Sequence, residues 1–146
     1  MKRSFVVTML AAVMCSSLTL SADAKDKAPG LDGTWIPASA ELAGKKLPAN
    51  ALASWKLVIK DADYTFTSNE PTDKGTVNVD QSAKPMTMDI KGVDGPNKGK
   101  TILAIFELKG DNLKVCYDVG GPKRPTEFQT KEDTSLFLVD YKRQKP

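Results

Sequence analysis

Histidine is absent from this chain of 146 residues, and cysteine occurs only twice. The lack of histidine removes the commonest general base, the usual catalytic triads and most zinc sites. Cys15 lies in an apolar N-terminal run, so Cys116 would be the only thiol of a processed chain, without a partner for an internal disulfide. We therefore expect a protein that is not an enzyme and has no cofactor or metal site, in which Cys116 is inert and partly covered.

A strong excess of one charge is also missing, because 21 basic side chains stand against 18 acidic ones. Removal of residues 1–24 would take away two positive charges and one negative charge and leave a formal net charge of +2. A net charge this close to zero differs from the strongly positive charge that is typical of nucleic-acid-binding domains. We expect no nucleic-acid partner, and the sequence does not indicate an oligomeric state.

The N-terminal residues have the pattern of a secretory signal. Lys2 and Arg3 precede an apolar run over residues 5–20, and Ala22-Asp23-Ala24 fits a cleavage site. We therefore predict a signal peptide over residues 1–24. Two alternatives stay open: an uncleaved membrane anchor, for which the run is short, and a lipoprotein attached at the cysteine of this run.

The rest of the chain predicts a single domain. Residues 25–30 are polar and contain Ala, Pro and Gly, which is typical of a linker. Residues 31–146 are enough to bury one core and too few for a second domain. We expect this domain to be secreted or periplasmic, without stable insertion in a membrane after the signal is removed.

Apolar and polar side chains alternate along most of the domain, which is typical of strands with one buried face. Two-residue loops at Gly110-Asp111 and Asp61-Ala62 would form two hairpins. The apolar residues would then face one another, in the pairs Leu108–Leu113, Phe106–Val115, Ala104–Tyr117, Ile59–Tyr64 and Leu57–Phe66. With the other alternating segments we predict about eight strands and one short helical turn within residues 48–54. The fold class is therefore all-β, a small antiparallel barrel.

The two ends of this domain carry a resemblance to a known family. Gly33-Thr34-Trp35 near the start and Lys142-Arg143 at the end of the last predicted strand resemble lipocalins, in which a basic side chain lies over the tryptophan of the Gly-x-Trp motif. A cation over an indole ring contributes about 0.5 to 2 kcal/mol. The resemblance implies that Gly33, Trp35 and Arg143 form the barrel floor.

A closer resemblance links the chain to a group of secreted bacterial domains, abundant in planctomycetes, with a lipocalin-like fold. It rests on the motifs LDGTW at 31–35, GKKLP at 44–48, GPNKGKT at 95–101, LKVCY at 113–117 and RPTEF at 124–128. The resemblance covers nearly the whole domain. It implies a lipocalin-like fold and a location outside the cytoplasm, and it brings no established activity.

The predicted apolar face leaves two states of the interior open. A barrel of about eight strands is filled by its own side chains or holds one small ligand. A cavity of ~300 Å³ or more would favour a ligand. Our preferred hypothesis is a non-catalytic lipocalin-like barrel that binds a small apolar molecule, with the candidate binding residues Tyr64, Phe66, Met86, Met88, Phe106 and Tyr117.

A second hypothesis concerns basic residues in two loops. Lys98 and Lys100 lie in one predicted loop, and Lys123 and Arg124 lie in another. If the two loops share a rim, these cations would steer an acidic partner, such as a protein, a polysaccharide or a membrane surface. Simple solvation of the four charges is the plainer interpretation.

Catalysis by paired carboxylates is the third possibility. The candidates for such a hydrolase are Asp89, Glu107, Asp118 and Glu127. Glu107 would face Lys114, and the others lie at outward or strand-end positions, which favours ion-paired or solvated charges. Residues 95–101 resemble the end of a phosphate-binding loop, but three residues instead of four separate the glycines and a strand should follow, so we expect a hairpin connection.

Overall fold

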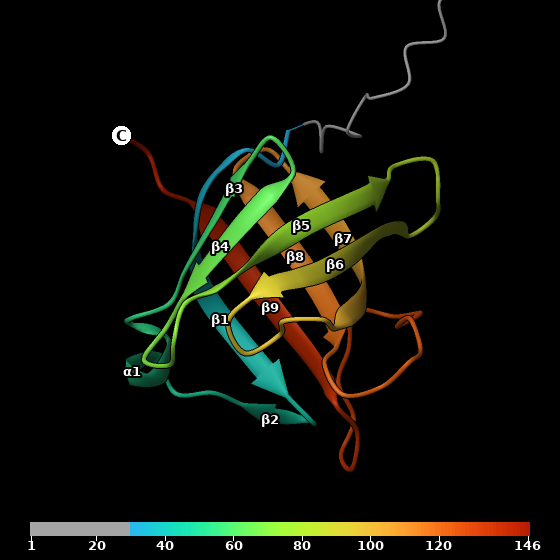
Figure 1. Cartoon of the computed structure of the whole chain (residues 1–146). Helices are drawn as coiled ribbons and strands as arrows, with labels where there is room; N and C mark the ends of the chain where they lie inside the picture. Colours follow the sequence, from blue (N-terminus) through green and yellow to red (C-terminus); the bar gives the residue numbers. More distant parts are fainter. Residues whose placement is uncertain (1–29) are drawn as a thin grey trace, which may run out of the picture.

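Nine strands form one antiparallel sheet in the computed structural model, which describes residues 30–146 (Figure 1). Their order is β2-β1-β3-β4-β5-β6-β7-β8-β9, and pairing of β1 with β9 closes eight of them into a barrel. The predicted all-β barrel is thereby confirmed, with β2 as one extra strand. The predicted signal peptide and residues 25–29 of the predicted linker lie outside the described residues.

The elements are short and follow the predicted alternation. Only one helix occurs in residues 30–146, a single turn that directly follows Pro48. Within the same residues no helix has the length and apolar character needed to cross a bilayer. The bounds are β1 Gly33–Leu42, β2 Lys45–Lys46, α1 Ala49–Leu52, β3 Lys56–Lys60, β4 Asp63–Thr67, β5 Asp73–Asp80, β6 Met86–Asp94, β7 Thr101–Lys109, β8 Asn112–Asp118 and β9 Leu136–Arg143.

The registers of both predicted hairpins are confirmed. Leu108 pairs with Leu113 across the β7–β8 turn, and Ile59 pairs with Tyr64 across the β3–β4 turn. Asp61 and Ala62 both have positive φ, at 50° and 69°, as the type I′ turn of a tight hairpin requires. Because side chains alternate with a period of two, these registers bring the apolar residues of β3, β4, β7 and β8 into one interior.

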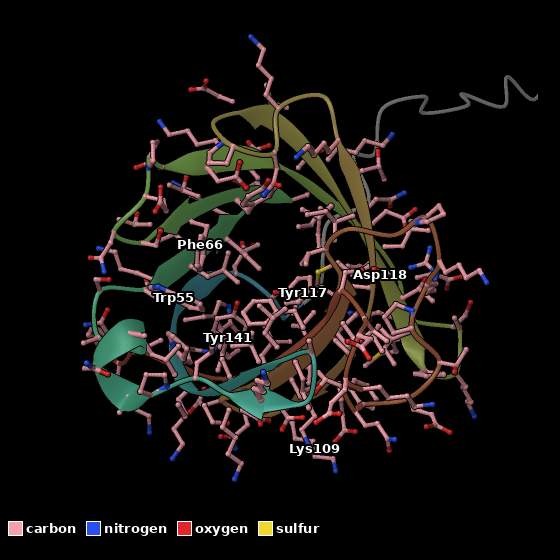
Figure 2. The ribbon with its side chains drawn as sticks, turned by 90° about the horizontal axis from the view of Figure 1, so that it is seen from below. Trp55, Phe66, Lys109, Tyr117, Asp118 and Tyr141 are labelled. Atoms are coloured by element: carbon pink, nitrogen blue, oxygen red, sulfur yellow. The ribbon has the colours of Figure 1, made fainter. Side chains whose placement is uncertain are left out.

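The two ends of the barrel differ. One end, at the top of Figure 1, carries the β3–β4, β5–β6 and β7–β8 connections. The other carries α1, β2 and the connections at residues 68–72, 95–100 and 119–135. Figure 2 views the molecule from this second side. We call them the closed end and the open end.

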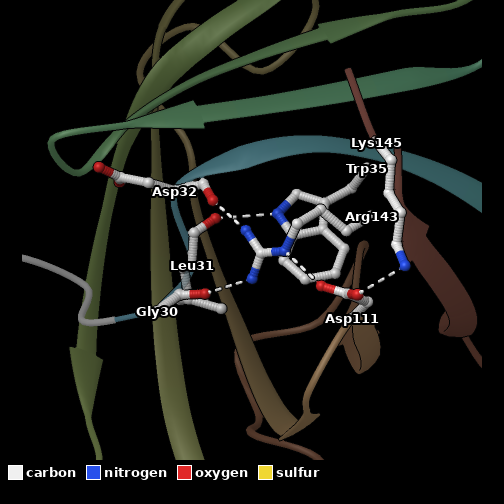
Figure 3. Close-up of polar contacts among 7 residues, drawn as sticks. All are labelled: Gly30, Leu31, Asp32, Trp35, Asp111, Arg143 and Lys145. Carbon is white, nitrogen blue, oxygen red and sulfur yellow. Dashed lines mark hydrogen bonds and ion pairs between the residues drawn. The ribbon is translucent and has the colours of Figure 1, made fainter.

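The closed end is built around Trp35, whose side chain is fully buried. Its Nε1 donates a hydrogen bond to the Leu31 carbonyl at 2.9 Å, and the Arg143 guanidinium lies 4.3 Å from the ring centroid (Figure 3). Arg143 also donates to the carbonyls of Gly30 and Asp32 and pairs with the Asp111 carboxylate. These contacts tie the N-terminal entry to the last strand, in the geometry that the resemblance to lipocalins implies.

Glycine at position 33 suits this contact. Its φ is +141°, a backbone conformation that L side chains rarely adopt, and an added Cβ would lie 2.7 Å from Arg143 Nη1. A larger residue would strain the backbone and force the end of the Arg143 side chain to shift. The backbone conformation and this close approach explain why glycine stands two residues before Trp35.

Cys116 is fully buried, although it points outward from the barrel, so the prediction of a partly covered thiol is wrong. Residues 119–135 fold back against the outer wall, and the thiol Sγ lies 3.8 Å from the Gln129 carbonyl. Burial raises the pKa of this thiol. A buried thiol with a raised pKa is a poor nucleophile, in agreement with the expected inertness.

Candidate functional site

A cavity of ≈130 Å³ lies inside the barrel and extends to Asn97 and Val119 at the open end. Its wall is mostly apolar and comes from strands β3 to β9, with Leu57, Val77, Ile90 and Val115 among its residues. Toward the closed end it reaches Ile59 and Leu113, beside the β3–β4 and β7–β8 turns. Trp35 and Phe106 are almost completely buried in the core and do not line the cavity.

The structure divides the six predicted binding residues into two groups. Tyr64, Phe66, Met88 and Tyr117 line the cavity. Met86 and Phe106 do not, because they pair with each other near the closed end, where their side chains fill the core. The geometry of this cavity therefore gives no support to a binding role for these two residues.

The cavity is also smaller than the ~300 Å³ that would by itself favour ligand carriage. An apolar cavity of about 150 Å³ is nevertheless large enough to bind benzene. At ≈130 Å³ the barrel interior has room for a molecule of about one ring.

Four aromatic side chains form a connected group at the open end of the barrel, and Figure 2 labels three of them, Trp55, Phe66 and Tyr117. Trp55 meets Phe66 edge-on at 5.6 Å between ring centroids and Phe137 edge-on at 5.9 Å. Tyr117 stacks on Phe137 at 5.8 Å. We call Trp55, Phe66, Tyr117 and Phe137 the aromatic mouth. Its rings form a connected apolar rim with edges and faces directed at one another, which is the favoured geometry for aromatic groups.

A buried carboxylate adds a polar group to this apolar wall. Asp73 lines the cavity and is only 6 % exposed. Its Oδ2 accepts hydrogen bonds from Tyr64 Oη at 2.9 Å and from Asn97 Nδ2 at 2.7 Å, and its Oδ1 accepts one from the Asn97 amide at 3.1 Å. Burial, followed by the hydrogen bond and the charge of Asp73, raises the pKa of the Tyr64 phenol.

Two glycines allow this cluster to form. Gly75 pairs with Tyr64 across the sheet, and an added Cβ there would lie 2.7 Å from the tyrosine ring. Gly95 has a φ of +92°, and its Cβ would lie 2.9 Å from the Asp73 Cα. Their missing side chains let the Tyr64 ring lean toward Asp73 and let the β6–β7 turn close over it.

A second polar contact lies deeper in the barrel. The hydroxyls of Tyr117 and Tyr141 are 3.3 Å apart, so each of these buried groups has a partner. Burial raises the pKa of Tyr117 well above its usual value and that of Tyr141 to about 12. Both phenols are therefore neutral over the physiological range and present hydrogen-bonding groups without charge.

The four candidate carboxylates of a hydrolase do not form a common site. Asp89 pairs with Arg124 at 2.5 Å, while Asp118 accepts hydrogen bonds from the Gly121 amide and the Ser135 hydroxyl. Glu107 does face Lys114 in register, but its ion pair is with Lys109 at 2.7 Å, which corrects the predicted pairing. The hydrogen bond from Lys109 lowers the pKa of Glu107. Glu127 is exposed.

The predicted basic rim is only partly present. Lys98, Lys100 and Lys123 are exposed. Arg124 is not available to a partner in the same way, because it also donates to the carbonyls of Met88 and Ala104 and thereby holds residues 119–135 against the outer wall. The part of Arg124 in binding an acidic partner stays a prediction, and its guanidinium is already engaged within the chain.

Sequence reasoning missed several residues of the site. Trp55 and Asp73 could have been found, because inward-facing side chains recur at every second residue of a strand. Trp55 comes two residues before the inward-facing Leu57, and Asp73 comes four residues before the inward-facing Val77. Asn97 comes from a turn without any period, so no local pattern indicates that it caps Asp73.

Within residues 30–146 no three Cys, Asp or Glu side chains gather closely enough to hold a metal ion. Comparison of the chain with protein-family models, curated proteins and solved structures found no match. Membership in the secreted bacterial group thus stays a prediction.

Proposed function

We propose that this protein is a secreted, non-catalytic binding protein that holds one small, mainly apolar molecule in the cavity at the open end of its barrel. The observation that carries the proposal is the cavity of ≈130 Å³ behind the aromatic mouth. Its size favours a compact ligand of about one ring over a lipid or a large pigment. The aromatic mouth supplies apolar contact at the point where such a ligand would enter.

The size of the cavity sets the expected affinity. A molecule of one ring buries about 150–200 Å² of apolar surface, which is worth about 4–5 kcal/mol at ~25 cal/mol per Å². This corresponds to a Kd on the order of 0.1–1 mM for a ligand without polar contacts. Additional polar groups on the natural ligand would strengthen its binding.

Toluene is a suitable first probe, because it is apolar and has one ring. At ten times its Kd it should add about 1.4 kcal/mol to the free energy of unfolding of residues 25–146, since it binds only the folded barrel. We expect an increase in Tm of about 5 °C, measured by circular dichroism. Absence of any increase with toluene, and likewise with one-ring compounds that carry a polar group, would refute the proposed function.

A pair of variants locates the site. Phe66→Arg places a charge in the aromatic mouth and should abolish the effect of toluene on Tm. Thr65→Arg adds the same charge to the adjacent outward position of β4 and should keep the effect. Equal responses of the two variants would show that toluene binds elsewhere.

A further inference from the structure

We propose that the ligand of this cavity is a small primary amine, whose protonated amino group pairs with Asp73 while its apolar body occupies the cavity. This inference rests on the proposed function, because it names the chemistry of the molecule that the same cavity takes. It is argued from the charge, the free acceptor position and the surroundings of Asp73.

Asp73 is a buried charge without a compensating cation. Aspartate is almost never buried unless it is paired. In the part of the chain that the structure describes, the ion pairs involve Asp89, Glu107, Asp111 and Asp140, and none involves Asp73. Its hydrogen-bond partners, Tyr64 and Asn97, are neutral donors, so none of them supplies the positive charge that a buried carboxylate favours beside it.

The carboxylate also has room for one more donor. An ionised carboxylate offers about four acceptor positions. Tyr64 and Asn97 occupy three of them, two on Oδ2 and one on Oδ1. Oδ1 keeps one free acceptor position, and Asp73 lines the cavity, so we assign this position to a donor on the ligand.

The site is arranged before a ligand binds. The contacts from Tyr64 and Asn97 hold both oxygens of the carboxylate in place. A carboxylate that is already fixed loses little conformational entropy when a ligand binds. The free energy of the new ion pair therefore contributes almost fully to the affinity.

The surroundings favour a cation over other ligand groups. Phe66 is the direct cross-strand neighbour of Asp73, and it belongs to the aromatic mouth. An ammonium group close to aromatic faces gains a cation–π attraction, whereas a carboxylate ligand would be repelled by Asp73. A neutral hydroxyl would gain one hydrogen bond without the charge interaction.

The volume limits the body of the amine. A cavity of ≈130 Å³ accommodates one aromatic ring or a branched alkyl group of similar size, joined to the amino group by a short linker. We therefore assign the ligand to the class of small primary monoamines with an aromatic or branched alkyl body.

Four probes of similar shape test this assignment by isothermal titration calorimetry at pH 7: benzylamine, benzyl alcohol, toluene and benzoate. We expect benzylamine to bind at least about tenfold more tightly than toluene and benzyl alcohol, as for a hydrogen bond to a charged group, and benzoate to bind most weakly. Asp73→Asn should remove the preference for benzylamine and leave the affinity for toluene unchanged.

Asp94→Asn is the matched control, because it neutralises an exposed acid at the end of β6 near the same end of the barrel. It should keep the preference for benzylamine. A loss of the preference in this control equal to that in Asp73→Asn would overturn the assignment to Asp73. The wild-type series decides the question even where Asp73→Asn does not fold.

The two proposals fail in different ways. Equal affinities of the wild-type protein for benzylamine and toluene would overturn the amine inference and leave the proposed function intact. Absence of binding by all four probes would overturn the proposed function, and the amine inference with it.

Discussion

Replacement of Arg143 by methionine should strongly destabilise the barrel. Methionine keeps an apolar side chain over Trp35 but removes the guanidinium, which lies 4.3 Å from the ring centroid. The lost cation–π contact is worth about 0.5–1 kcal/mol at a partly exposed site. Loss of the hydrogen bonds to the carbonyls of Gly30 and Asp32 destabilises the fold by about 1–3 kcal/mol more. Loss of the partly exposed ion pair with Asp111 destabilises it by less than about 1 kcal/mol. We expect a total loss of about 2–4 kcal/mol.

Urea unfolding followed by tryptophan fluorescence measures this loss. With an m value of about 1.5–2 kcal/mol per M, the midpoint for Arg143→Met should fall by about 1–2 M, and the m value should stay the same. Lys142→Met is the control, because Lys142 is exposed in the same strand, and it should change stability by less than about 0.5 kcal/mol. If the two variants lose equal stability, our account of the closed end is wrong.

Two further predictions concern the tyrosines and the thiol. Burial raises the pKa of Tyr64, Tyr117 and Tyr141, which are the 3 tyrosines of the chain. Their contribution to stability is therefore complete below about pH 10, the usual tyrosine value, and is lost as pH rises through the higher folded-state values. Tyrosinate absorbance at 295 nm should stay low in the folded protein until about pH 12, and ionisation near pH 10 in a protein that is still folded would contradict this. Arg124→Met should release residues 119–135 from the outer wall and thereby expose Cys116. The rate at which Cys116 reacts with Ellman's reagent should then increase by at least about tenfold, whereas Lys123→Met should leave this rate unchanged. Equal rates in the two variants would argue against this role of Arg124.

The fold was largely predictable, because local patterns determine it. Each two-residue loop fixes the register of its hairpin, and the period of two then assigns every side chain to a face. Leu108 and Leu113 illustrate this, since their pairing follows from the loop at Gly110-Asp111 alone. Closure of the barrel follows from the number of strands, which removes exposed edges.

The candidate site was predictable only in part, because it depends on packing between distant segments. Alternation places Met86 and Met88 on the same face, but only their depth along the barrel decides that Met88 lines the cavity while Met86 does not. The contact of Arg124 with Ala104 on the outer wall joins residues 20 positions apart, and that of Asn97 with Asp73 joins residues 24 positions apart. No repeat or spacing in the sequence indicates either of them.

The two ends of the barrel are held by separate sets of contacts. Trp35 and Arg143 join the first and last strands at the closed end, and the rings of the aromatic mouth pack on one another at the open end. A substitution in the aromatic mouth therefore leaves the cation and the indole ring undisturbed. The entrance of the cavity can be altered in this chain without loss of the contacts that close the barrel.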